Sequence, residues 1–213
     1  MSLLSHILPH ETKYASIRDL LDKSAHDGDF YILLVGATML VIGGIFIDSV
    51  PVLIASMIIA PLGYPILSLG LGIIARSSRL ITRSTVLLVA ACSTALLLAG
   101  LSTFIVPESA PEKYVVFTGH RYTALIVAVV SGFIAAYGMI KPKVATATTG
   151  VAIAVSLLPP LVASGINYAN GNMDIGNDAM IMFLLNVAGV LGASTLIFWL
   201  FGMGKAYRTI DNR

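Results

Sequence analysis

Six long apolar runs constrain the fold of this chain more than any other feature of its sequence. An α-helix needs about 20 apolar residues to cross about 30 Å of hydrocarbon. Because no water reaches the bilayer core to satisfy a bare backbone, each run must be helical there. The sequence therefore predicts an all-α integral membrane protein with six transmembrane helices, at approximately residues 30–47, 51–75, 84–106, 122–140, 144–169 and 179–203.

Charged residues are too scarce for a soluble protein. They make up 11% of the chain, and hydrophobic residues make up 57%, whereas a soluble domain carries about 25% charged residues. The basic residues lie between the runs and form no patch, so no nucleic-acid partner is predicted. Cys92 is the only cysteine and lies inside an apolar run, so the sequence predicts no disulfide framework.

The lysines and arginines fall mostly on one side of a six-crossing bundle. Eleven of the thirteen lie in the terminal segments, between runs two and three, or between runs four and five. The other two, Lys113 and Arg121, share the opposite side with five acidic residues. By the positive-inside rule, both termini are predicted to be cytoplasmic.

A more polar segment precedes the first run. Tyr14, Ile17, Leu20 and Leu21 recur there at helical spacing among charged residues. This pattern predicts an amphipathic helix that rests on the membrane surface or on the bundle and ends at Gly28. The segment lacks the basic start and apolar stretch of a signal peptide. The predicted units are a cytoplasmic amphipathic segment (1–29), a first membrane repeat (30–106), an external loop (107–121), a second membrane repeat (122–203) and a cytoplasmic tail (204–213).

The two halves of the membrane region resemble each other when the sequence is shifted by 95 residues. Residues 30–47 then fall on 125–142, and residues 84–106 fall on 179–201. PILSLG, which starts at Pro65, falls on PLVASG, which starts at Pro160. Since each half has three crossings, the second copy must be inverted, as in many transporters with interrupted helices. The predicted fold is two inverted three-helix repeats, with the second helix of each broken at proline.

The two proline breaks suggest a binding site. Proline interrupts a helix but fits the first turn of a new one, so Pro65 and Pro160 could each open a half-helix near the bilayer centre. The free N–H groups that follow carry partial positive charge and suit an anion or a polar group. The alternative is that both segments are simply kinked spanning helices.

Polar residues near the breaks complete the candidate site. Asn186 should point into the bundle, either to contact a ligand or to donate an interhelical hydrogen bond. The predicted substrate-binding residues are Ser56, Tyr64, Pro65, Ser68, Ser156, Pro160, Ser164 and Asn186.

The apolar runs lack the groups that catalysis needs. No Asp, Glu, Lys, Arg or His lies in the middle of a run, which disfavours a proton relay and leaves a nucleophile without a base. His6, His10 and Glu11 lie close in sequence, but the pattern is too weak to predict a metal site. We therefore expect no enzyme activity, catalytic residue, cofactor or metal.

Two stretches resemble the signatures of a known family. They are ASMIIAPLGYPILSLGLGI at residues 55–73 and GVAIAVSLLPPLVASGI at residues 150–166. In this order they resemble the prokaryotic uncharacterised hydrophobic domain family, domain of unknown function number 389. The resemblance implies an oligomeric, polytopic protein of the prokaryotic cytoplasmic (inner) membrane. It implies no substrate.

Three functions remain open from the sequence. The first is a carrier or channel for a small polar or anionic solute, with its site at the two breaks. The second is a non-transporting homo-oligomer, associated through ridges of small residues, whose N-terminal helix binds a protein partner. The third is a lipid-binding protein in which the basic loop of Arg76, Arg79 and Arg83 contacts anionic headgroups.

Overall fold

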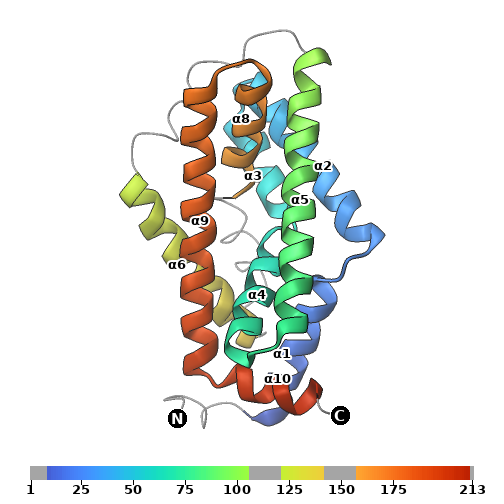
Figure 1. Cartoon of the computed structure of the whole chain (residues 1–213), viewed down its shortest axis with the longest axis vertical. Helices are drawn as coiled ribbons and strands as arrows, with labels where there is room; N and C mark the ends of the chain where they lie inside the picture. Colours follow the sequence, from blue (N-terminus) through green and yellow to red (C-terminus); the bar gives the residue numbers. More distant parts are fainter. Residues whose placement is uncertain (1–8, 106–120, 142–156, 212–213) are drawn as a thin grey trace.

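Helices account for every element in the part of the chain that the computed structural model describes, which is residues 9–105, 121–141 and 157–211. The two longest of them run along the same axis, and the short helix nearest the C-terminus lies across one end (Figure 1). The helices are α1 (His10–Lys23), α2 (Gly28–Phe46), α3 (Val50–Ile59), α4 (Gly63–Ala75), α5 (Ser78–Ile105), α6 (Arg121–Ile140), α8 (Leu158–Ala169), α9 (Met173–Leu200) and α10 (Met203–Asp211).

The predicted all-α fold is confirmed, and several of its helices suggest a membrane protein. Within the described residues, α2, α5, α6 and α9 are each long and apolar enough to cross a bilayer, and α3 with α4 adds a fifth span if the bent pair is counted as one. Large apolar side chains also cover the outer surface: Leu97 is 67% exposed, Phe104 85% and Ile126 64%. Such a surface suits contact with lipid. The start of the fifth predicted run, up to Ser156, lies outside the described residues.

The amphipathic N-terminal helix packs on the bundle. Ile17 and Leu20 of α1 are buried, and α1 contacts α4, α6 and α10. The prediction that this helix ends at Gly28 is wrong. It ends at Lys23, and Gly28 is the first residue of α2, because the side chain of Asp27 accepts a hydrogen bond from the Phe30 N–H at 3.0 Å and caps the new helix.

The second predicted run is divided into two helices. Helix α3 stops at Ile59 and α4 starts at Gly63, with a bend of 45° between them. Pro61 explains the break, because the residue before a proline is driven out of the helical region. Ala60 is accordingly extended, with ψ of 124°. Pro65 lies in the first turn of α4, and Pro159 and Pro160 lie in the first turn of α8.

Corresponding helices begin 95 residues apart. Helix α4 begins at Gly63 and α8 at Leu158; α5 spans Ser78–Ile105 and α9 spans Met173–Leu200. Both long helices have 28 residues. The chain passes along α5 toward one end of the bundle and along α9 toward the other (Figure 1).

Each short helix crosses the long helix of the other half at a glycine. A Cβ on Gly165 of α8 would lie 2.8 Å from the Cβ of Ala99 on α5. A Cβ on Gly70 of α4 would lie 3.0 Å from the hydroxyl of Ser194 on α9. Gly165 lies 95 residues after Gly70, and Ser194 lies 95 residues after Ala99. The two crossings therefore use equivalent positions.

The predicted ridges of small residues face other helices of the same chain. Ala91, Ala95 and Ala99 are fully buried. A Cβ on Gly132 of α6 would lie 2.7 Å from the Val190 Cα, and one on Gly189 of α9 would lie 2.8 Å from the Ala128 Cβ. These residues bring helices together within one chain.

Candidate functional site

The short helices α4 and α8 both begin inside the bundle. Leu62, Gly63 and Pro65 at the start of α4 are buried, as are Leu158 and Pro160 at the start of α8. From the middle of the bundle the two helices run toward opposite ends (Figure 1). The first N–H groups of a helix have no partner within it and carry partial positive charge. Two such helix starts therefore lie in the interior.

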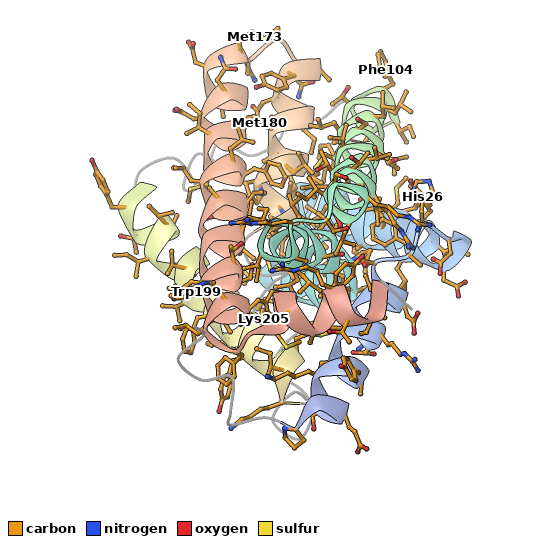
Figure 2. All side chains as sticks on the ribbon, turned by 60° about the horizontal axis from the view of Figure 1, so that its bottom comes forward. His26, Phe104, Met173, Met180, Trp199 and Lys205 are labelled. Carbon is orange, nitrogen blue, oxygen red and sulfur yellow. The ribbon has the colours of Figure 1, made fainter. Side chains whose placement is uncertain are left out.

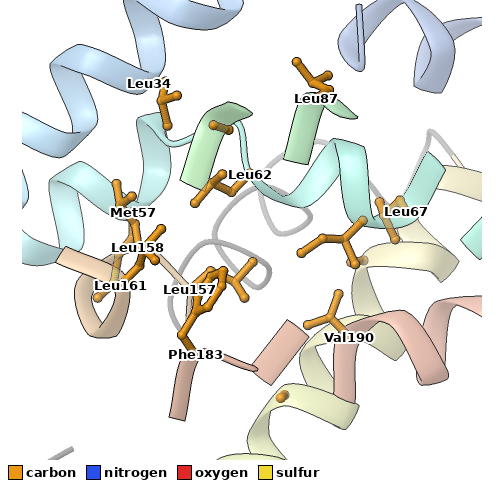
Figure 3. Packing of buried hydrophobic residues seen from close by; sticks show 14 of the residues in the cluster. Leu34, Met57, Leu62, Leu67, Leu87, Leu157, Leu158, Leu161, Phe183 and Val190 are labelled. Atoms are coloured by element: carbon orange, nitrogen blue, oxygen red, sulfur yellow. The ribbon is translucent and has the colours of Figure 1, made fainter. Parts of the chain in front are cut away.

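Apolar side chains line the region around these helix starts. Leu62, from the break before α4, lies in the same cluster as Leu157, at the entry to α8, and Phe183 of α9 (Figure 3). Met57, near the end of α3, faces Leu158 (Figure 3). The described surroundings of the two helix starts are therefore mainly apolar.

Ser68 and Ser164 are the polar side chains that best fit an interior site. Each is fully buried, and neither hydroxyl has a hydrogen-bond partner in the described part of the chain. A serine in an apolar helix normally bonds back to a carbonyl of the preceding turn. Ser102 does so, donating to the Ala99 carbonyl at 2.6 Å. Each of the two short helices, α4 and α8, therefore carries one buried serine whose hydroxyl could bind a ligand.

Two other predicted residues have local roles in the fold. The Ser56 hydroxyl donates to the Leu53 carbonyl at 2.6 Å, within its own helix. The half-buried ring of Tyr64 lies beside α1, with the Lys23 Nζ 5.6 Å from the ring centroid. Burial lowers the pKa of Lys23, but its 2.9 Å hydrogen bond to Asp19 and the charges nearby raise it, and the net shift is upward.

Asn186 lies inside the bundle, as predicted. It is 3% exposed and shares a face of α9 with Gly189 and Val190, which pack against α6. Ser156 lies outside the described residues. The structure thus places Ser68, Ser164 and Asn186 in the interior on three helices.

Comparison with known proteins identifies the family. The model of the family described as "Domain of unknown function (DUF389)" matches residues 57–191. This chain belongs to the DUF389 family. It is 30% identical over 174 residues to an uncharacterised protein of Methanocaldococcus jannaschii, an alignment that covers 81% of this chain and 54% of that protein. The chain thus spans about half the length of this relative. No solved structure matches it.

The DUF389 match includes both short helices and most of the candidate residues. It runs from Met57 at the end of α3 to Leu191 on α9, so it contains Ser68, Ser164 and Asn186. It stops before α10. The family description supplies no ligand, so the chemistry of the interior rests on the residues themselves.

Sequence reasoning did not select Thr195 of this DUF389 member, although its hydroxyl lies in the bundle interior. The Oγ1 of Thr195 on α9 is buried without a hydrogen-bond partner among the described residues. It lies beside the close crossing of α4, 3.0 Å from a Cβ placed on Gly70. Its sequence signal is only a threonine in an apolar run, which gives no reason to select it over Thr94 or Thr103. Those two threonines bond to their own helix.

The predicted arginine cluster is divided between two elements. Arg76 follows the last residue of α4 and adopts a left-handed backbone with φ of 54°. Arg79 and Arg83 lie in the first two turns of α5. All three are exposed, and Arg76 is the one that lies at the end of α4.

Proposed function

We propose that the membrane region consists of six crossings arranged as two inverted three-helix repeats. The 95-residue offset between corresponding helices and the matched crossings at Gly70 and Gly165 support this. The opposite directions of α4 and α8 support it as well (Figure 1). The basic ends of α4 and α10 favour a topology with cytoplasmic termini in the inner membrane of a prokaryote.

We propose that this DUF389 protein is a carrier or channel for a small polar or anionic solute. The observation that supports it most is a pair of opposed helix starts in the bundle interior, each followed by a buried serine whose hydroxyl has no partner in the described part of the chain. Discontinuous helices with opposed ends form solute sites in several transporter folds. Backbone N–H groups after Pro65 and Pro160 would hold negative charge, and Ser68, Ser164 and Asn186 would add directional hydrogen bonds.

Two leucines between the starts of α4 and α8 limit how a solute could reach the proposed site. Leu62 and Leu157 fill the space there (Figure 3), so a solute would reach the site only after these side chains separate. A carrier that alternates between two states fits this packing better than an open pore. The oligomeric alternative loses its main support, since the ridges of small residues pack within one chain.

The test compares serine variants in a ligand screen. Purified protein is heated with small anions and polar metabolites, because a ligand at a hundred times its Kd should stabilise the fold by about 2.7 kcal/mol. Ser68→Ala and Ser164→Ala should fold normally, since neither hydroxyl has a partner to lose among the described residues, but should reduce the stabilisation by the ligand. Flux of that solute into liposomes should fall in parallel.

The matched control is Ser102→Ala. This serine is also buried, but its hydroxyl bonds to its own helix. The Ser102→Ala variant should leave ligand-induced stabilisation and flux unchanged. A solute that binds and crosses equally well in the Ser68, Ser164 and Ser102 variants would refute this site.

A further inference from the structure

A basic cavity lies at the end of the bundle where α4 ends and α10 begins. Its volume is about 500 Å³, within the range of about 300–1,000 Å³ usual for small-molecule sites. Three cations line it: Arg76, Lys205 and Arg208. Ile73, Ile74 and Trp199 form its apolar part. Positive charge and apolar surface therefore meet in one cavity.

Two glycines bring the cationic residues together. Gly202 turns the chain between α9 and α10 with φ of 72°, a conformation that other residues rarely adopt. Gly204 then packs against α4 so closely that a Cβ there would lie 2.8 Å from the Ile74 carbonyl oxygen. This approach sets Lys205 and Arg208, on the first two turns of α10, beside the residue that ends α4.

The three cations are available to an anion. None of them forms an ion pair with a carboxylate of the described residues, and the salt bridge between Lys23 and Asp19 does not involve them. The Arg208 Nε donates to the Gly204 carbonyl at 3.4 Å, which leaves its two terminal NH₂ groups for another acceptor. The first turn of α10 also starts at this cavity, so its N–H groups add partial positive charge.

The apolar part of the cavity lies at the surface that faces lipid. Trp199 is 49% exposed and Ile73 44%. Trp199 is on the last turn of α9, next to the start of α10 where Lys205 lies (Figure 2). Tryptophan is enriched where membrane helices meet the headgroup layer. The cavity thus sits at the level of lipid headgroups.

We propose that this cavity binds the phosphate headgroup of an anionic phospholipid, separately from the interior solute site. Guanidinium groups bind phosphate through paired, charge-assisted hydrogen bonds, which Arg76 and Arg208 supply. Basic pockets on the cytoplasmic side of membrane proteins recognise such headgroups. Trp199 and Ile73 lie where acyl chains would continue, and free phosphate would leave this apolar surface unused.

The single tryptophan makes the site directly measurable. Trp199 is the only tryptophan in the chain, so its fluorescence reports on this cavity alone. The full chain is reconstituted into vesicles that contain brominated phosphatidylglycerol or brominated phosphatidylcholine, since bromine quenches tryptophan on contact. We expect stronger quenching by the anionic lipid, and competition by unbrominated phosphatidylglycerol but not by inorganic phosphate.

Variants separate a site from general attraction to the membrane. Arg76→Gly suits the left-handed backbone at this position, so the fold should persist while about a fivefold preference for the anionic lipid is lost. Lys205→Gln should have a similar effect. Arg79→Gln removes one charge from the same end of the bundle but none from the cavity, and should retain the preference.

Three results would overturn the proposal. The first is equal quenching of the wild-type protein by both lipids. The second is an equal loss of preference in Arg76→Gly and Arg79→Gln, which would indicate diffuse surface charge. The third is displacement of the lipid by millimolar inorganic phosphate, which would assign the cavity to the free anion.

Discussion

Two residues hold a backbone conformation that favours glycine. Asp48 and Arg76 have φ of 52° and 54° and follow the ends of α2 and α4. At both ends the next residue donates back to the helix, Ser49 to Gly44 at 2.9 Å and Ser77 to Gly72 at 3.1 Å. This is the Schellman motif, whose left-handed position is usually glycine. A side chain there costs roughly 1–2 kcal/mol.

Replacing either residue by glycine should stabilise the protein. For Arg76→Gly the relief of backbone strain exceeds the loss of a cation at a helix C-terminus, worth about 0.3–1 kcal/mol, so we expect a net gain of about 0.5 kcal/mol. Asp48→Gly relieves the same strain, and because Asp48 also takes part in an interaction of the folded chain, we expect a gain below about 1 kcal/mol. Thermal unfolding in detergent measures both. Destabilisation by Arg76→Gly would show that its side chain supports the fold itself.

The cap of α2 is a second residue-scale test. The Asp27 side chain accepts the Phe30 N–H, and removal of such a cap costs about 1 kcal/mol. Asp27→Ala should therefore lower the unfolding temperature, whereas Asp27→Asn should retain most of the stability, because an amide oxygen can accept the same bond. Equal loss in both variants would assign the effect to charge instead of capping.

At the scale of elements, much of the arrangement follows from sequence. The apolar runs locate the long helices, and the prolines locate the break between α3 and α4. Both can be read from sequence, because helix formation in an apolar run and helix interruption by proline depend on residues of one segment alone. The end of α1 was mispredicted, since Gly28 suits a helix end as well as the position after an N-cap. Which serines lack partners could not be predicted, because Ser56 and Ser68 have similar sequence neighbours and differ only in the hydrogen bonds they make.

The crossing of α8 over α5 should show coupled mutations. Gly165→Ala forces a Cβ to 2.8 Å from that of Ala99, and overpacking of this kind costs roughly 1–3 kcal/mol. Ala99→Gly removes the obstructing atom but costs about 1 kcal/mol in helix stability. The double variant should be more stable than the sum of the two single effects implies, as measured by unfolding in detergent.

A control for this crossing is Gly192→Ala. A Cβ at Gly192 meets nothing within 4 Å, so this variant should unfold at or above the wild-type temperature. If Gly165→Ala is equally harmless, or if the effects of Gly165→Ala and Ala99→Gly on stability simply add in the double variant, the two helices do not cross as closely as the structure indicates.

At the scale of the whole molecule, the proposed inversion predicts on which side of the membrane each long helix starts. Helices α5 and α9 have 28 residues each, about 42 Å at 1.5 Å per residue, enough to cross the hydrocarbon. Their first residues, Ser78 and Met173, are exposed and lie at opposite ends of the bundle (Figure 1). Arg76 and Arg79 flank the first of these starts, which favours the cytoplasmic side for it.

Cysteine labelling can decide this topology, because Cys92 is the only cysteine and Cys92→Ala gives a cysteine-free background. In that background, Ser78→Cys should react with a membrane-impermeant maleimide only from the cytoplasmic face, in inside-out vesicles. Met173→Cys should react only from the outer face, in intact cells. Labelling after solubilisation shows that both thiols are reactive. Labelling of both from one face would exclude inverted repeats, because the two helices would then enter the membrane from the same side.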